Sequence, residues 1–156
     1  MSYLFLRFAA LISVLASVFV PSIALPDTFK SQQMRFDRVR DASRIKESSL
    51  KQLFATRKLQ YPPSRLLLRA FKRERLLQVW VGDGESQLTL LKEYPFCAMS
   101  GELGPKRRGG DGQIPEGFYT IDRFNPLSNY HLSLGVSYPN ASDRELGTKE
   151  IGRAHV

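Results

Sequence analysis

Several features that define common protein classes are missing from this sequence. Cys97 is the only cysteine in the 156-residue chain, and it lies far from the start, so a bacterial lipoprotein anchor is not expected. The first apolar run, residues 8–20, is well short of the roughly 20 residues that cross a bilayer. Internal repeats and low-complexity tracts are also absent. These absences favour an ordinary globular chain over a membrane-anchored or repetitive one.

The first residues have the layout of a secretory signal peptide. Arg7 supplies a short positive region, the apolar run of residues 8–20 follows, and Pro21 breaks it. Residues 22–24, Ser-Ile-Ala, place small side chains at both positions that a signal peptidase reads. We therefore expect residues 1–24 to be a signal peptide and the protein to be exported to the periplasm or cell envelope. No stable membrane anchor is expected after cleavage; an uncleaved anchor is the alternative.

Charge is the unusual quantity in the composition. The net charge is +8, and the sequence pI is about 9.9. A basic surface attracts polyanions, of which nucleic acid is the first candidate on composition alone. An exported protein meets little DNA, so we expect no nucleic-acid partner; peptidoglycan stem peptides and anionic envelope polymers carry suitable carboxylates and phosphates instead. The alternative is that the basic residues serve solubility only.

The apolar spacing changes near residue 62. Residues 25–61 are polar, with apolar side chains at loosely helical spacings, which predicts a helical segment that packs against the following domain. After the prolines at 62 and 63, short apolar runs alternate with turn residues at 72–74 and 82–85. We expect a mainly β domain over residues 62–149 rather than an α/β fold. The predicted strands are residues 66–71, 76–81, 88–91 and 94–99.

Residues 101–117 are rich in glycine. A phosphate loop is excluded because no Gly-Lys-Ser/Thr ending and no helical pattern follow, and residues 109–112 match no dinucleotide fingerprint. Glycine and aspartate are usual turn residues, so the simplest interpretation is a long turn. The pattern Pro115-x-Gly117-x-Tyr119-x-Ile121 overlaps its end, and in an extended chain it would carry Tyr119 and Ile121 on one face.

This pattern, with Ser-Gly-Glu-Leu-Gly-Pro-Lys at residues 100–106, resembles the central strand-turn-strand segment of the L,D-transpeptidase (YkuD-type) catalytic domain of bacterial cell-wall enzymes. Residues 66–80 resemble the opening hairpin of the subgroup named murein L,D-transpeptidases. Residues 125–134 and 138–144 resemble the segment that precedes its catalytic motif. The resemblance extends over residues 61–149 and implies an incomplete β-sandwich.

The resemblance also implies a chemistry. In that family a cysteine thiolate attacks a peptidoglycan stem peptide, a histidine takes the thiol proton, and backbone N–H groups hold the oxyanion. An amine acceptor gives a crosslink, whereas water gives carboxypeptidase or release activity. The motif for this chemistry, His-Gly, a spacer and Ser-x-Gly-Cys, does not occur in this sequence. We therefore assign no catalytic residue, and we expect no cofactor and no metal.

Cys97 and His131 are the residues from which a substitute dyad would have to be built. Cys97 lies in an apolar run, so we expect a buried strand residue that serves as a small hydrophobe. His131 lies where the resemblance places a loop near the cleft, and we expect it to donate to substrate carboxylates. Tyr138 and Arg108, in the resembling segments, are the other predicted substrate-binding residues.

The last residues suggest a non-native end. Residues 150–156 read Glu-Ile-Gly-Arg-Ala-His-Val, and one back-translation of them contains the opening of a short-read sequencing adapter. We therefore expect that this tail is foreign, that His155 has no function and that the natural protein continues past Lys149 into the catalytic motif. A natural polar terminus is the alternative. Residues 25–149 alone are expected to be unstable and prone to aggregation through open sheet edges.

Three function classes follow from the sequence. The first is an L,D-transpeptidase or L,D-carboxypeptidase in its full-length form, with the present chain inactive because it lacks the nucleophile motif. The second is a non-catalytic, basic wall-binding module that uses the same scaffold. The third is a nucleic-acid-binding protein, which the charge alone supports.

Overall fold

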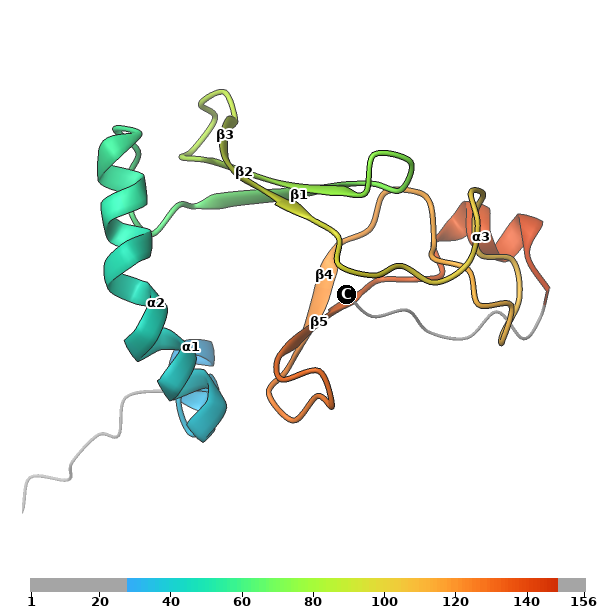
Figure 1. The fold of residues 1–156 in the computed structure, drawn as a ribbon, viewed down its shortest axis with the longest axis horizontal. Helices are drawn as coiled ribbons and strands as arrows, with labels where there is room; N and C mark the ends of the chain where they lie inside the picture. Colours follow the sequence, from blue (N-terminus) through green and yellow to red (C-terminus); the bar gives the residue numbers. More distant parts are fainter. Residues whose placement is uncertain (1–27, 149–156) are drawn as a thin grey trace, which may run out of the picture.

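The structure is a computed structural model that describes residues 28–148. Over this range a helical arm leads into two antiparallel sheets and a short third helix (Figure 1). This confirms the predicted mainly β fold with a helical N-terminal segment. The predicted signal peptide and the predicted foreign tail lie outside the described residues. No helix within residues 28–148 combines the length and the apolar character that a bilayer crossing requires.

The helical arm consists of α1, Phe29–Gln33, and α2, Asp37–Thr56. The Thr28 hydroxyl caps α1 by accepting a hydrogen bond from the backbone N–H of Ser31. The surface of α2 carries oppositely charged pairs three or four residues apart, which add modest support to an exposed helix. These pairs are Asp37–Arg40, Asp41–Arg44 and Glu47–Lys51. The helix ends before the prolines at 62 and 63, as the sequence predicts.

Sheet A contains β1, Arg65–Phe71, β2, Leu76–Gly82, and β3, Thr89–Pro95, in the order β1-β2-β3. The central strand β2 is the most buried of the three because it has a neighbour on each side. The pairing of β2 with β3 shifts between Val79 and Trp80, which leaves Leu91 as a bulge. Sheet A is therefore a three-stranded meander in which both outer strands are edges among the described residues.

Sheet B is the hairpin of β4, Ile121–Asn125, and β5, Ser133–Val136. Its two strands pair with a register shift between Ile121 and Arg123. Gly135 is required in β5 because a Cβ atom at this position would lie 2.8 Å from Nε of Arg123. The helix α3, Ala141–Leu146, follows β5 and ends the described chain.

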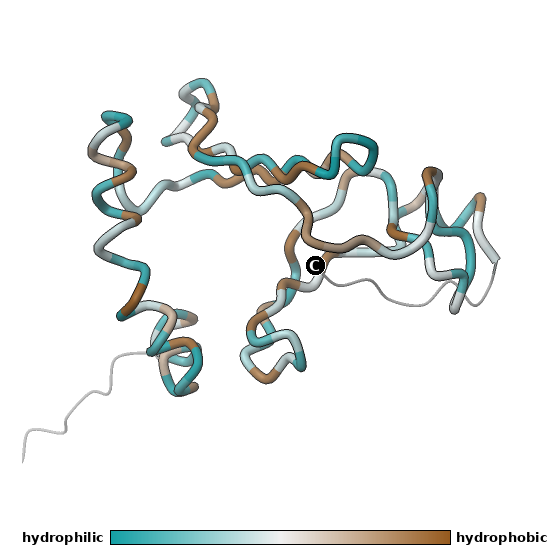
Figure 2. The backbone as a smooth tube through the Cα atoms, viewed as in Figure 1, coloured by the Kyte–Doolittle hydropathy of each residue, from teal (hydrophilic) through white to brown (hydrophobic). Residues whose placement is uncertain are grey.

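The core of the molecule is small and divided. Phe54 of α2 packs with Val81 of β2 and Leu91 of β3, and all three are at most 5% exposed. A second cluster forms around Tyr138, against which Tyr119 and Val136 pack. Figure 2 shows apolar residues interspersed with polar ones along α2 and the strands, so each element contributes few core positions. The first cluster confirms that the helical arm packs against the domain that follows it.

Some local predictions were wrong. Residues 88–91 and 94–99 were expected as two strands, but a single strand β3 ends at Pro95, and Cys97 is exposed beyond it. The strand expected at residues 115–121 is absent: the chain is irregular up to Ile121, where β4 begins. The physical reason is that side chains, rather than a strand ladder, satisfy the backbone of this region, as described below.

Candidate functional site

The long connection between β3 and β4, residues 96–120, holds the glycine-rich segment that the sequence singles out. It lies beside the β1–β2 turn and α3, at the side of the molecule away from the helical arm (Figure 1). Polar and charged side chains, most of them buried or half-buried, bond it to these elements. We call the set Lys72, Lys106, Asp111, Glu116, Tyr119, Tyr138, Asn140 and Asp143 the loop network.

Asp111 organises the turn that contains the basic residues. Its carboxylate accepts hydrogen bonds from Nζ of Lys106 at 2.6 Å and from the backbone N–H groups of Arg107 at 2.8 Å, Arg108 at 3.0 Å and Gln113 at 3.1 Å. The Lys106 ammonium also donates to the Arg108 carbonyl at 2.9 Å. These side-chain bonds replace the ladder of a regular strand.

Lys72 fastens the connection to sheet A. Its ammonium donates to the carbonyls of Gly104 at 2.6 Å and Ile114 at 3.2 Å, and it pairs with Oε1 of Glu116 at 2.9 Å. The same Glu116 oxygen accepts from the backbone N–H of Gly104 at 2.9 Å. The turn between β1 and β2 is therefore joined to both ends of the glycine-rich segment.

Asp143 joins the connection to α3. It is 2% exposed, and its Oδ2 accepts from the Tyr119 hydroxyl at 2.8 Å and from the Asn140 backbone N–H at 3.0 Å. Asn140 returns a bond through Oδ1, which accepts from the Asp143 N–H at 2.9 Å, so the two form a reciprocal capping box. The Asn140 side chain also donates to the Phe118 carbonyl at 3.4 Å. The short helix α3 and its N-cap thus hold the residues that lead into β4.

Two glycines allow the close approach of these segments. Gly101 has φ of 71°, and a Cβ atom there would lie 2.2 Å from Oε1 of Gln113. That oxygen accepts the Glu102 N–H at 2.9 Å. At Gly117 an added Cβ would lie 2.9 Å from the Tyr119 hydroxyl. At both positions an added side chain would collide with a neighbouring residue, so the requirement for glycine does not come from turn geometry alone.

The electrostatics of the loop network favour a fixed scaffold over acid–base chemistry. The Lys106 ammonium holds the pKa of Asp111 well below its usual range, with help from the backbone donors at Arg107, Arg108 and Gln113. The Lys72 ammonium likewise lowers the pKa of Glu116. Burial, and then donation to Asp143, raise the pKa of the Tyr119 hydroxyl. Near neutral pH Asp111 and Glu116 stay ionised acceptors and the Tyr119 hydroxyl stays a donor.

The structure brings Tyr138 and the chain around Arg108 together. Tyr138 is 6% exposed, and its hydroxyl donates at 3.3 Å to the carbonyl of Lys106, two residues before Arg108. Burial raises the pKa of this hydroxyl, so it stays protonated. Arg108 uses its backbone N–H on Asp111 while its side chain is exposed. Two of the three predicted substrate-binding residues therefore lie near each other: Arg108 is exposed at the surface, and Tyr138 bonds to the turn that carries it.

The structure does not bring His131 to the same place. His131 is exposed in the loop that joins β4 to β5, with φ of 76°, whereas Tyr138 follows the other end of β5. Its carbonyl accepts from the Arg38 guanidinium of α2 at 3.2 Å, and Arg38 also donates to the Ser128 carbonyl at 2.7 Å. The helical arm therefore supports the loop that carries His131. Substrate binding by His131, Tyr138 and Arg108 stays a prediction.

Cys97 is not the buried hydrophobe that the sequence suggests. It is exposed in the irregular segment beyond β3, where the Phe96 N–H donates to the Arg75 carbonyl at 2.7 Å. Its exposure follows from the end of the ladder at Pro95. Within residues 28–148, no group of three or more histidine, cysteine, aspartate or glutamate side chains could hold a metal ion.

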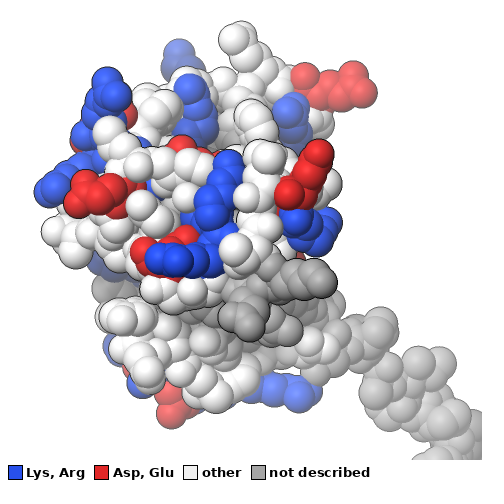
Figure 3. All heavy atoms as spheres, turned by 90° about the vertical axis from the view of Figure 1, so that its right-hand side faces the viewer, with Lys and Arg blue, Asp and Glu red and all other residues white. Residues whose placement is uncertain are grey.

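The surface near the loop network is mixed in charge. Figure 3 shows the side of the molecule that lies on the right in Figure 1, and basic and acidic side chains are interspersed there. Arg107 and Arg108 belong to this side through the Asp111 turn. A carboxylate ligand would meet individual arginines here rather than a continuous positive patch.

The sequence analysis did not predict that charged side chains of the loop network are buried and paired. Lys106 and Asp143 are 9% and 2% exposed, and charged residues are seldom this buried unless they are paired. One available signal was the spacing of Asn140 and Asp143, which fits a helix N-cap with an acidic third residue. The partners of Lys72 and Lys106 are set by tertiary contact, which no local pattern reveals.

Comparison with known proteins finds sequence similarity to two proteins that share one name. The chain is 44% identical over 92 residues to "Putative L,D-transpeptidase YafK" of Escherichia coli (strain K12) and equally to the protein of that name in Escherichia coli O157:H7. The match covers 58% of this chain and 37% of each relative, so the chain spans well under half the length of the relatives it matches. No family model matches the chain, and no solved structure matches it. The similarity supports an L,D-transpeptidase-type family.

Proposed function

We propose that this chain carries part of the scaffold of an exported L,D-transpeptidase-type enzyme that modifies peptidoglycan. The observation that carries the proposal is the 44% identity over 92 residues to a relative of that name. The mainly β architecture behind a helical arm is compatible with it. The ligand that we propose is the stem peptide of peptidoglycan, whose carboxylates suit a chain of net charge +8.

The proposed full-length enzyme uses covalent catalysis. A cysteine thiolate adds to a stem-peptide carbonyl, backbone N–H groups hold the oxyanion, and the amide bond breaks to leave a thioester. A histidine takes the thiol proton and gives it to the departing amine. An amine acceptor then forms a crosslink, and water instead gives carboxypeptidase or release activity. The chain lacks the His-Gly and Ser-x-Gly-Cys motif, so we propose that it binds stem peptides without cleaving them.

The proposed contacts to the substrate come from the exposed side chains. The Arg108 guanidinium is suited to a bidentate contact with a carboxylate, and Asp111 fixes the turn that presents it. His131 would donate to a second carboxylate from the β4–β5 loop. The role that we propose for Tyr138 is to position the Arg108 turn through its bond to the Lys106 carbonyl.

A second candidate function is a non-catalytic, basic wall-binding module. The observation that favours it is the net charge of +8 together with the missing nucleophile motif. The two candidates share the ligand and differ in whether a longer polypeptide of this family cleaves it.

The proposal is tested by cosedimentation of the full chain with purified peptidoglycan. We expect the chain to sediment with the wall, and Arg108→Gln to weaken binding by roughly two- to fivefold, as exposed charge contacts typically do. Arg73→Gln is the matched control because it removes the same charge from the exposed β1–β2 turn. Failure of the unmodified chain to bind, or equal losses in both variants, would contradict the proposed site.

A further inference from the structure

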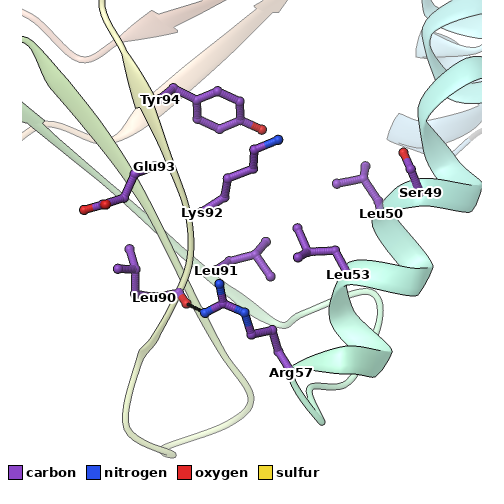
Figure 4. Close-up of a pocket in the computed structure, with 9 residues that line it drawn as sticks. All are labelled: Ser49, Leu50, Leu53, Arg57, Leu90, Leu91, Lys92, Glu93 and Tyr94. Atoms are coloured by element: carbon purple, nitrogen blue, oxygen red, sulfur yellow. Dashed lines mark hydrogen bonds between the residues drawn. The ribbon is translucent and has the colours of Figure 1, made fainter.

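A groove lies between helix α2 and strand β3, apart from the loop network. Its volume is about 500 Å³, within the range of small-ligand sites. Leu50 and Leu53 of α2 and Leu91 of β3 give it apolar walls. Figure 4 shows that Lys92 and Tyr94 extend from β3 toward the helix, whereas Glu93 points the other way. The bulge at Leu91 places Leu91 and Lys92 in succession on the groove side.

The groove runs along an open sheet edge. Among the described residues, β3 pairs with β2 on one side and with no strand on the other. The Leu90 carbonyl faces outward, because it accepts a hydrogen bond from Nη1 of Arg57 across the groove at 2.8 Å. An edge of this kind offers backbone groups to an added strand, which at Leu90 would take the place of the Arg57 guanidinium. The groove lies between β3 and α2.

The charges that face the groove are positive. Arg57 and Lys92 line it, and Glu93, the acidic residue of the lining, turns to the opposite face and accepts from Nε2 of Gln78 at 2.7 Å. The whole chain carries a net charge of +8, so a second copy of it would be repelled. Charge complementarity therefore favours an acidic occupant.

We propose that this groove binds an extended, acidic segment of a partner protein, which adds to β3 as a fourth strand of sheet A. The main chain of the segment pairs with the β3 edge, an apolar side chain packs on Leu53 and Leu91, and carboxylates meet Arg57 and Lys92. A stem peptide fits this edge poorly because its D-residues interrupt the uniform side-chain alternation of a strand ladder. The proposal is thus independent of the peptidoglycan function.

The probe for this proposal is the peptide Glu-Thr-Leu-Thr-Glu-amide with fluorescein on its N-terminal amine, measured by fluorescence anisotropy with the full chain. We expect binding that weakens about tenfold when the central leucine is replaced by its D-enantiomer, which keeps the composition and charge but breaks the ladder. Lys92→Gln and Arg57→Gln are expected to weaken binding about tenfold each. Lys92→Gln is the cleaner variant because Arg57 also holds Leu90.

Arg44→Gln is the matched control. Arg44 is on the same helix, pairs with Asp41 and does not line the groove, so its loss changes the net charge equally and is expected to leave peptide affinity unchanged. The proposal is overturned by absent binding, by equal affinity of the two enantiomers, or by equal losses in Arg44→Gln and Lys92→Gln. Displacement of the probe by purified stem peptides would also overturn it, since that would assign the groove to the wall.

Discussion

Asp111 shows how a single side chain can shape a segment that has no regular secondary structure. Its carboxylate collects the Lys106 ammonium and three backbone N–H groups, and the paired side chains are only 10% and 11% exposed. Three backbone N–H groups of residues 107–113 are satisfied through this one group. The position of Arg108, the proposed substrate contact, therefore depends on the ionised state of Asp111.

Acid should weaken the fold through this carboxylate. The Lys106 ammonium lowers the pKa of Asp111 in the folded state, whereas an unfolded aspartate titrates near 3.9. A lowered folded pKa contributes stability that is present above about pH 4 and is lost as the pH falls toward the folded value. We predict that the melting temperature drops below about pH 4 and that Asp111→Asn melts lower at pH 7 but changes less in acid. Parallel pH profiles of the two proteins would contradict this.

A comparison of alanine substitutions at Gly101 and Gly110 separates the free-energy cost of steric contact from that of backbone strain. Both have positive φ, 71° and 72°, but a Cβ at Gly101 would strike Gln113 and Gly112 while one at Gly110 would meet nothing within 4 Å. We predict that Gly110→Ala costs about 1 kcal/mol from conformation alone. Gly101→Ala should cost about 3 kcal/mol because the clash adds to it. Denaturant unfolding measures both; equal costs would show that the contact to Gln113 is unimportant.

Tyr119 connects the entry of β4 to α3 through Asp143. Tyr119→Phe removes the 2.8 Å bond but leaves Asp143 its Asn140 N–H donor, so we predict a loss of about 1 kcal/mol in the free energy of unfolding. Tyr130→Phe is the control, because Tyr130 is 90% exposed and its hydroxyl faces solvent. Chemical denaturation of both variants provides the test, and a neutral Tyr119→Phe would argue against the bond.

Helix α2 is the element that links the two sheets. Its C-terminal half packs on sheet A through Phe54, and Arg38 near its start holds the β4–β5 loop of sheet B. In α1, the Phe29 ring meets Phe124 of β4 with centroids 4.9 Å apart. The arm thus contacts both sheets.

Removal of the helix anchor should destabilise the whole described chain. Phe54 is 4% exposed and packs on Val81 and Leu91, so we predict that Phe54→Ala lowers the free energy of unfolding by about 3–5 kcal/mol. Ile45→Ala, on the same helix but 62% exposed, should change it by less than about 0.5 kcal/mol. Denaturant titration followed by circular dichroism measures both variants. A small effect at Phe54 would mean that the helix is not docked in solution.

The elements with strong local patterns were predictable. The polar helical segment and the meander of sheet A follow from periodicity and turn residues. The pattern at residues 115–121 misled because its alternation looks like a strand. In this segment the Phe118 carbonyl accepts from the Asn140 side chain, and the Thr120 N–H donates to the Ser137 hydroxyl. Among the site residues, the Arg108 turn could be anticipated from glycine and aspartate. The separation of His131 from Tyr138 could not, because it depends on the length and direction of β5.

The whole molecule combines a small core with a large exposed apolar surface. Phe118, Leu127 and Tyr130 are 96%, 71% and 90% exposed, while the buried apolar residues among positions 28–148 are Phe54, Val81, Leu91 and Tyr138. A small core leaves little free energy of unfolding, and the expectation that residues 25–149 are unstable and prone to aggregation alone stays a prediction. The small core also makes the stability assays above sensitive, since a few kcal/mol decide whether the chain folds.

The most direct test of the proposed function combines binding and turnover on one substrate. The full chain is mixed with a soluble, fluorescently labelled disaccharide-tetrapeptide from peptidoglycan, binding is followed by anisotropy, and mass spectrometry follows both substrate and protein. We predict salt-sensitive binding, no release of the terminal residue and no acyl adduct on Cys97, because the nucleophile motif is missing. Absence of binding would contradict the peptidoglycan proposal, and an adduct on Cys97 would contradict the proposal that this chain binds stem peptides without cleaving them.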